Sequence, residues 1–493
     1  MKKKPNILIL FTDMQRADTI HALGNPVIKT PNLDKLVKEG TAFTNCYSPS
    51  PVCIPARCCM HYGIYPQKTG LFTNGMMPED NGKSFQGLLS QNGYKTKAIG
   101  KCHFTPDNLA MRGFQSRLVQ EEGIDLENDD YRKFLKENGY DHIEPHGFRS
   151  EMYYIPQVST LPVEVHPTQW IGDRSIEFIE ENSTGETPWL MFSSFIHPHP
   201  PLSPPKPWHK LYRGPKMPLP NVPPDSEKMY TYINRHQNRY KYRDQGIDRN
   251  LVRGIKAFYY ATISFVDYQV GRIIDSLEKS GQLDNTLIIF TSDHGEYLGD
   301  YNCFGKRSMH DCSSKVPMIV RKPKLFEENK ICSELANLVD VMPTIMSAAG
   351  IDTSDIELDG CDLLKVASGD CDREEVFSQF GSGQKGIYMI VTKNFKYCYS
   401  AADDKELLFD KINDPDETRN AAGNPFYYVE QNEIKNKLLK YLKSTGMTEA
   451  FEENSEGILS WKKYPEYYGV SENPDDGLLI QDAPESLVEI EGY

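Results

Sequence analysis

Two apolar runs of the chain end in side chains that could do chemistry. Asp13 closes a run that begins at Asn6, and Asp293 and His294 follow a second run, Asn285–Ser292. Such runs are typical of buried parallel strands, and the carboxyl ends of parallel strands meet at one edge of a sheet. Two carboxylates and an imidazole gathered at that edge could bind a divalent metal. Taken singly, each aspartate could equally be a turn or helix N-cap residue.

Cys53 is a second candidate, and it stands four residues before Arg57 in the run Ser-Pro-Val-Cys-Ile-Pro-Ala-Arg. Pro55 is unfavourable in a strand but suits the first turn of a helix, where free N–H groups favour anions. A cysteine at such a helix start, beside an arginine, would have a lowered pKa and react as a nucleophile. The alternative is a buried, inert thiol. A zinc site with Cys58 and Cys59 is disfavoured, because no second ligand pair follows at a suitable spacing.

Cationic side chains follow further predicted strands. These are Lys101 and His103 after the run Tyr94–Gly100, His197 and His199 after the run Pro188–Ile196, and Lys306 in a polar loop after Asp293. Any one of them alone is more often solvated or structural. Together with the acids and the thiol, however, they form a consistent set, because acids hold a metal while Arg, Lys and His bind and protonate a tetrahedral oxyanion.

The elements that must position these residues alternate along the first 350 or so residues. Predicted helices cover Pro31–Gly40, Ser84–Asn92, Gln169–Glu181 and about Asn250–Ser280, and one more strand covers Val316–Arg321. In the longest helix, apolar residues recur every three or four positions from Ile255 to Leu277. This alternation predicts an α/β domain with a large, mostly parallel central sheet flanked by helices.

The pattern changes after residue 371. Short strand-like runs then follow one another: Glu375–Phe380, Gly386–Thr392, Phe395–Ser400 and Leu407–Asp410. One helix is predicted at about Tyr427–Leu442, and the tail beyond Lys463 has no Lys or Arg and many acids. We therefore predict an α/β domain over residues 1–371 and, over residues 372–493, an α+β subdomain with a small antiparallel sheet and an acidic tail. The Pro-rich segment Pro198–Pro224 is predicted to be a loop.

The composition excludes several classes of protein. The chain has 493 residues, of which 25% are charged and 39% hydrophobic, as in ordinary globular proteins. Its net charge of -14 makes nucleic acid and anionic membrane surfaces poor partners. The 11 cysteines are irregularly spaced, which disfavours a disulfide framework and suits a reducing compartment. Because we find neither a signal peptide nor an apolar stretch of the ~20 residues that a membrane span needs, we predict a cytoplasmic protein.

The motif Cys53-x-Pro55-x-Arg57, followed by Gly63, resembles the signature of the type I sulfatases in the alkaline phosphatase superfamily. Further segments resemble that family in the same order: Pro5–Asp13, Thr30–Leu36, Gly40–Asn45, Gly100–His103, His197–His199, Thr291–Glu296, Gly305–Lys306, Glu406–Asp410, Asp414–Glu417 and Asn420. The resemblance covers most of the chain. It implies an alkaline phosphatase-like fold and a sulfuric ester hydrolase that releases inorganic sulfate from a sulfated carbohydrate or a small organic sulfate.

The resemblance also implies roles for the candidate residues. In the family the motif cysteine is oxidised to formylglycine by a maturase, so Cys53 would become an aldehyde whose hydrate is the nucleophile. One divalent metal ion, Ca²⁺ in preference to Mn²⁺ or Mg²⁺, would bind residue 53. The remaining implied roles are metal binding by Asp13, Asp293 and His294, activation by Arg57, sulfate binding by Lys101 and Lys306, breakdown of the sulfated intermediate by His103, protonation of the leaving oxygen by His199, and a less favoured substrate contact from His197.

Some positions depart from the usual sulfatase pattern. Met14 stands where an oxygen ligand is common, His294 stands where asparagine is common, and Met60-His61-Tyr62 precedes Gly63. The Asp-His pair resembles the branch of phosphonate monoester hydrolases and choline-sulfatase-like enzymes. A phosphonate monoester or phosphodiester hydrolase with the same nucleophile and metal is therefore the alternative function. An inactive binding protein and a hydrolase that uses the unmodified thiol are further alternatives, and a homo-oligomer is left open.

Overall fold

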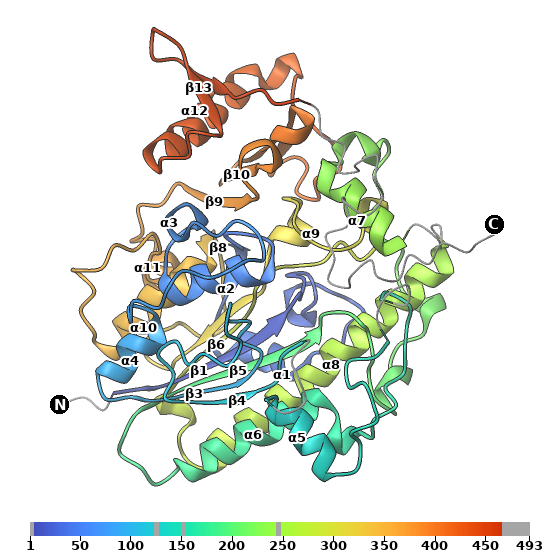
Figure 1. The fold of residues 1–493 in the computed structure, drawn as a ribbon, viewed down its shortest axis with the longest axis vertical. Helices are drawn as coiled ribbons and strands as arrows, with labels where there is room; N and C mark the ends of the chain where they lie inside the picture. The colour runs from blue at the N-terminus through green and yellow to red at the C-terminus, as the bar shows by residue number, and fades with distance from the viewer. Residues whose placement is uncertain (1–3, 123–127, 149–152, 243–247, 466–493) are drawn as a thin grey trace.

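The structure is a computed structural model that describes residues 4–122, 128–148, 153–242 and 248–465. Figure 1 shows a large sheet with helices on both faces, and a smaller sheet above it that carries its own helix. The helices are α1 Pro31–Glu39, α2 Cys53–Tyr62, α3 Pro66–Thr69, α4 Phe85–Gln91, α5 Asp130–Glu137, α6 Pro167–Glu181, α7 Tyr232–Tyr242, α8 Arg249–Lys279, α9 Asp311–Ser314, α10 Val341–Ala349, α11 Leu363–Ser368 and α12 Tyr428–Ser444. Within these described residues, no helix is both long and apolar enough to cross a membrane.

The large sheet has eight strands in the order β4-β3-β5-β1-β6-β7-β2-β8. In chain order they are β1 Asn6–Asp13, β2 Thr41–Tyr47, β3 Lys95–Gly100, β4 Ser116–Val119, β5 Trp189–Pro198, β6 Thr286–Ser292, β7 Met318–Arg321 and β8 Lys330–Asn337. All neighbouring strands run parallel except β7, which is antiparallel to both β6 and β2. The predicted α/β class and mostly parallel sheet are confirmed.

Strand β1 shows why the sheet has two covered faces. Its side chains alternate, so Ile7 and Ile9 pack in one apolar core with α2, α4, α10 and α11, while Leu8 and Leu10 pack in a second core with α1, α6 and α8. A parallel sheet covered in this way leaves the carboxyl ends of its strands as the edge where polar side chains gather. The long helix α8 lies close to its predicted bounds, and the Asp248 side chain caps its first turn.

The C-terminal sheet is antiparallel throughout, in the order β12-β11-β10-β9. These strands are β9 Glu375–Phe380, β10 Ile387–Thr392, β11 Phe395–Ser400 and β12 Lys405–Asp410. Helix α12 packs on it through Ile434, Leu438 and Leu442, beside a hairpin of β13 Phe451–Glu453 and β14 Leu459–Trp461. The small antiparallel sheet is thus confirmed. The domain boundary after residue 371 stays a prediction, and most of the acidic tail lies outside the described residues.

Three strands of the large sheet were not predicted, and the sequence analysis made no prediction for the direction of β7. Strands β4 and β8 are the two edges of the sheet, and β2 lies beside β8. Edge strands need no continuous apolar sequence, and in β8, Lys330–Asn337, the buried residues are Cys332, Ala336 and Asn337. The direction of β7 could not be read from its short sequence, Met-Ile-Val-Arg. The segment from Pro198 to Pro224 contains only short 3₁₀ turns, as expected for a loop.

Candidate active site

The carboxyl ends of β1 and β6 bring the two predicted aspartates together. The strands are neighbours with Thr12 opposite Ser292, so Asp13 and Asp293 leave the sheet side by side. The backbone N–H of Met14 donates to Asp293 Oδ1 at 2.9 Å, and Met14 adopts a positive φ of 69°. This turn fixes the Asp293 carboxylate relative to Asp13 across almost 280 residues of sequence.

Cys53 is the first residue of helix α2, as the position of Pro55 predicted. Its Sγ lies 3.0 Å from Lys306 Nζ, 3.3 Å from His294 Nε2 and 3.8 Å from Asp13 Oδ1. All ten residues of α2 are buried, so the helix start and its thiol lie beneath the surface. The thiol therefore meets both the acidic strand ends and a lysine that comes from a separate loop.

Four side chains could hold a metal ion: Asp13, Cys53, Asp293 and His294 are all buried, and their donor atoms lie within 4.8 Å of one another. His294 Nδ1 lies 3.0 Å from the carbonyl oxygen of Gly295, which accepts its proton and leaves the Nε2 lone pair directed at the cluster. Two carboxylates with one imidazole fit a divalent cation. The side chain of Met14 carries no oxygen and so supplies no oxygen ligand; its Sδ lies 3.9 Å from Lys306 Nζ.

Arg57 forms hydrogen bonds to both carboxylates, Asp13 and Asp293. Its Nε donates to Asp293 Oδ2 at 3.0 Å, and its Nη2 donates to Asp13 Oδ2 at 3.2 Å. Its Nη1 donates to the carbonyl oxygen of Lys101 at 2.8 Å, and the guanidinium lies over the ring of Phe11. Because all three nitrogens already have protein partners, Arg57 fixes the orientation of both acids.

Lys101 and His199 are linked through Glu122, which the sequence analysis missed. Lys101 Nζ lies 2.7 Å from both Asp13 Oδ2 and Glu122 Oε2, and His199 Nδ1 lies 3.3 Å from Glu122 Oε1. In the sequence, Glu121-Glu122 looks like an ordinary exposed acidic pair, so only the fold reveals this link. We call Asp13, Cys53, Arg57, Lys101, Asp293, His294 and Lys306 the Cys53 cluster; His199 is attached to it through Glu122.

The charges of the cluster lower the pKa values of two of its acidic groups, Asp13 and Cys53. Burial raises the pKa of Asp13, but Lys101, His199, Lys306 and Arg57 together hold it well below its usual range. Burial and Asp13 raise the pKa of the Cys53 thiol, yet Lys306, His294 and Lys101 outweigh them and hold it well below the usual value. The site therefore stabilises negative charge at residue 53.

The three histidines of the cationic segments have different surroundings. Burial lowers the pKa of His199, although Glu122 opposes this effect, and Nε2 lies 3.4 Å from the Tyr153 hydroxyl. His197 Nδ1 lies 2.9 Å from Thr168 Oγ1, its ring stacks on His166, and burial lowers its pKa to about 4. Among the described residues, no hydrogen bond or ion pair joins His197 or His103 to the Cys53 cluster. Their proposed roles stay predictions.

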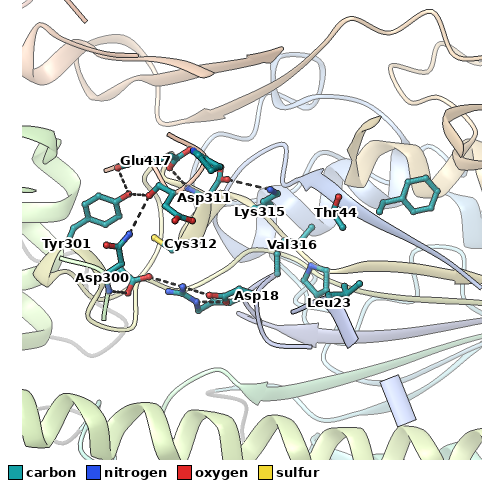
Figure 2. A pocket seen from close by; sticks show the side chains of 17 residues that line it. Asp18, Leu23, Thr44, Asp300, Tyr301, Asp311, Cys312, Lys315, Val316 and Glu417 are labelled. Atoms are coloured by element: carbon teal, nitrogen blue, oxygen red, sulfur yellow. Dashed lines mark hydrogen bonds and ion pairs between the residues drawn. The ribbon is translucent and has the colours of Figure 1, made fainter. Parts of the chain in front are cut away.

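A cavity of about 530 Å³ lies elsewhere, lined by residues of the large domain and by Pro415, Asp416 and Glu417. Figure 2 shows Asp18 and Asp300 on one side of it and Asp311, Lys315 and Glu417 on the other. We call Asp311, Lys315, Lys396, Lys411 and Glu417 the Asp311 cluster. No member of the Cys53 cluster lines this cavity. The chemistry predicted from the sequence therefore does not converge on it.

Comparison with known proteins agrees with this geometry. The family described as "Sulfatase" matches residues 5–351, and "N-sulphoglucosamine sulphohydrolase, C-terminal" matches residues 299–444. An arylsulfatase of Clostridium perfringens is 29% identical over 498 residues, covering 94% of this chain and 98% of that protein. An N-acetylglucosamine-6-O-sulfatase of Bacteroides thetaiotaomicron is 26% identical over 502 residues, covering 88% and 85%.

A solved structure supports the fold. The phosphonate monoester hydrolase of Agrobacterium radiobacter superposes with a TM-score of 0.79 at 23% identity, covering 94% of this chain and 100% of that one. The family match spans well over half of the chain, and it includes the strand ends and the helix start that build the Cys53 cluster. The chain therefore belongs to the sulfatase family: it is a hydrolase of sulfuric ester bonds with an alkaline phosphatase-like fold.

Proposed function

We propose that the chain releases inorganic sulfate from a sulfated carbohydrate or a small organic sulfate, with formylglycine formed from Cys53 as the nucleophile. The observation that carries this proposal is the position of Cys53 Sγ, which lies 3.0 Å from Lys306 Nζ and 3.3 Å from His294 Nε2 at a buried helix start. A separate maturase would oxidise Cβ and replace the sulfur by an aldehyde oxygen. The hydrated aldehyde then carries two hydroxyl groups at this position.

Asp13, residue 53, Asp293 and His294 would hold one divalent ion. Ca²⁺ is our first choice, and Mn²⁺ or Mg²⁺ are the alternatives. Bound there, the ion would supply positive charge that acidifies the hydrate and draws electron density from the ester oxygens. Arg57 keeps the Asp13 and Asp293 carboxylates in place for this task through its bonds of 3.2 and 3.0 Å. Lys306 and Lys101 would bind the sulfate oxygens as charge-assisted donors.

The reaction needs one group to donate a proton and another to accept one. One hydroxyl of residue 53, after losing its proton to solvent, attacks sulfur, a new O–S bond forms, and the bond from sulfur to the substrate oxygen breaks. His199 protonates that leaving oxygen; the lowered pKa of its imidazole makes the protonated form a stronger acid. His103 then accepts the proton of the second hydroxyl, so that the aldehyde reforms and inorganic sulfate departs.

The alternative is a phosphonate monoester or phosphodiester hydrolase that uses the same nucleophile and metal site. The Asp293-His294 pair and the fold shared with a phosphonate monoester hydrolase favour keeping it. The two functions separate by kcat/KM on 4-nitrophenyl sulfate and on 4-nitrophenyl phenylphosphonate, measured on one preparation of matured, metal-loaded enzyme. The proposal expects the sulfate ester to be the better substrate, and dominant turnover of the phosphonate would overturn it.

Two further predictions belong with this proposal. All eleven cysteines lie in described ranges and are free thiols there, and the cytoplasmic location stays a prediction from the sequence. A maturase and a sulfated small molecule or saccharide are the expected partners, while nucleic acid and membrane are not expected. A homo-oligomer stays open.

A further inference from the structure

Arg307 follows Lys306 directly and is held beside the nucleophile. Its backbone N–H donates at 2.9 Å to the carbonyl oxygen of Pro51, two residues before Cys53. Its φ is +79°, a left-handed conformation that a residue with a side chain adopts only where its surroundings impose it. Only 6% of the residue is exposed. The local backbone therefore forces a long cation under the surface next to residue 53.

Within the part of the chain that the structure describes, the guanidinium of Arg307 lacks an acidic partner. Its one side-chain hydrogen bond to a described residue runs from Nη1 to Gln237 Oε1, at 3.4 Å, and no described carboxylate forms an ion pair with it. Gln237, on helix α7, is itself fixed because its Oε1 also accepts from the Lys306 backbone N–H at 3.1 Å. Neutral Gln237 cannot compensate a buried charge.

The neighbouring cations are paired differently. Arg57 bonds to Asp13 and Asp293, and Lys101 bonds to Asp13 and Glu122, so these two cations and three carboxylates form one network. Lys306 contacts Cys53. Arg307 is left as a fourth cation without an acid among the described residues. An arginine buried in this way suits an anion that arrives with the substrate.

We propose that Arg307 forms a subsite for a second anionic group of the substrate, a carboxylate or a second sulfate on the part that leaves as the alcohol. This rests on the proposed sulfatase function, since the first anion is the scissile sulfate held by Lys101, Lys306 and His199. The electrostatic neighbours of Arg307 agree: burial lowers its pKa, and Cys53, Tyr153 and Tyr154 partly oppose this effect. Tyr153 also meets His199, the group proposed to protonate the leaving oxygen.

Inert sulfonates test this subsite without requiring turnover. Calorimetric titration of matured, metal-loaded enzyme with benzenesulfonate and with 2-, 3- and 4-sulfobenzoate compares one anion with two at three spacings. We expect at least one sulfobenzoate to bind about tenfold more tightly than benzenesulfonate, which is the usual gain from one charge-assisted bond. Equal affinities for all four ligands would overturn the proposal.

Variants then assign the preference to Arg307. Arg307→Gln should reduce the ratio of the two affinities to less than about threefold, and Arg307→Lys should retain part of it, because the charge remains. Arg132→Gln is the matched control, since Arg132 forms an exposed ion pair with Glu144, and it should keep the wild-type ratio. If Arg307→Gln weakens benzenesulfonate as much as the sulfobenzoates, Arg307 holds the first anion and the proposal is wrong.

The same preparations distinguish failure of the subsite from failure of the proposed function. Turnover of 4-nitrophenyl sulfate with equal sulfonate affinities would leave the sulfatase function standing and remove the subsite. An Arg307-dependent preference for sulfobenzoate in an enzyme that hydrolyses no sulfate ester would leave the anion subsite standing and remove the sulfatase function.

Discussion

The Cys53 cluster and the Asp311 cluster are both networks of charged side chains, but the first is fully buried while only Lys396 and Glu417 are buried in the second, and the two differ in how their charges are paired. In the Asp311 cluster, Lys396 and Lys411 each contact both Asp311 and Glu417, and the backbone N–H of Asp311 donates to Glu417 at 2.9 Å. Every buried charge there has an opposite charge beside it. This network joins α9 to strand β11 and to the segment after β12.

The Cys53 cluster is incomplete by the same standard. Two carboxylates, an imidazole and residue 53 converge on one point, while Lys306 and the adjoining Arg307 have no carboxylate partner among the residues that the structure describes. Burying charge without a partner destabilises a protein unless something else compensates it. We infer from this difference that the Asp311 cluster serves the fold, whereas the Cys53 cluster fits a metal ion and an anionic substrate.

The largest predicted effect is the loss of activity when the nucleophile of the Cys53 cluster is removed. Cys53→Ala leaves neither a thiol nor a formylglycine precursor, so we expect kcat/KM on 4-nitrophenyl sulfate to fall on the order of 10⁴-fold or more, with the far-ultraviolet dichroism unchanged. Cys312→Ala, which lines the cavity beside the Asp311 cluster, is the matched control and should keep its activity. Comparable turnover by Cys53→Ala would remove residue 53 from the reaction.

A substitution that breaks ion pairs of the Asp311 cluster should instead lower the free energy of unfolding. Lys396→Met leaves Asp311 and Glu417 short of their fully buried partner, and we expect the free energy of unfolding to fall by about 3–5 kcal/mol in denaturant titrations. Lys437→Met, from an exposed pair with Glu374, should change it by less than about 1 kcal/mol. A Lys396→Met protein as stable as the wild type would show that the Asp311 cluster is not structural.

The affinity for a divalent metal ion should depend on the Cys53 cluster and not on the Asp311 cluster. Asp293→Asn replaces a carboxylate oxygen that accepts from Arg57 by an amide group, so we expect divalent-ion affinity to fall at least about tenfold, measured by calorimetry and elemental analysis. Asp416→Asn, at the cavity of the other cluster, should retain the wild-type affinity. Unchanged metal content in Asp293→Asn would exclude Asp293 from the ligands.

The smallest predicted effect is a pH dependence of the protein's stability that comes from Asp311 in the Asp311 cluster. Burial raises the pKa of Asp311, but Lys396, Lys315 and Lys411 together hold it well below its ordinary value. Its stabilising contribution is therefore complete above the unfolded pKa of about 3.9 and is lost as the pH falls below that value. The stability difference between wild type and Asp311→Asn should shrink between pH 6 and pH 3 in urea titrations; a difference that grows on acidification would reverse the assigned sign.

The sequence was informative wherever chemistry follows a strand or starts a helix. Asp13, Asp293, Cys53 and their apolar runs were predicted because buried strands and a Pro-containing helix start leave local signatures. The antiparallel direction of β7 leaves no such signature, because a run of three apolar residues and Arg321 is compatible with either direction. The mostly parallel sheet could be predicted, but its strand order depends on contacts between distant segments.

The two site residues that the sequence analysis missed, Glu122 and Arg307, also depend on contacts between distant segments. Glu122 looks like one of many surface acids until the fold places it between Lys101 and His199. Arg307 was visible beside Lys306, yet an arginine in a polar loop is usually solvated, and only the structure shows that it is buried. Burial and pairing are set by the tertiary structure, and these two properties single out the cations for which we propose a function.

The most direct test of the account is mass spectrometry of the tryptic peptide 39–57, which ends at Arg57 and contains residue 53. The protein is produced with and without a formylglycine-generating maturase, and sulfate release is measured on both samples. The account predicts an aldehyde at residue 53 only after maturation, with turnover proportional to its fraction. An intact Cys53 thiol in a fully active enzyme would contradict it.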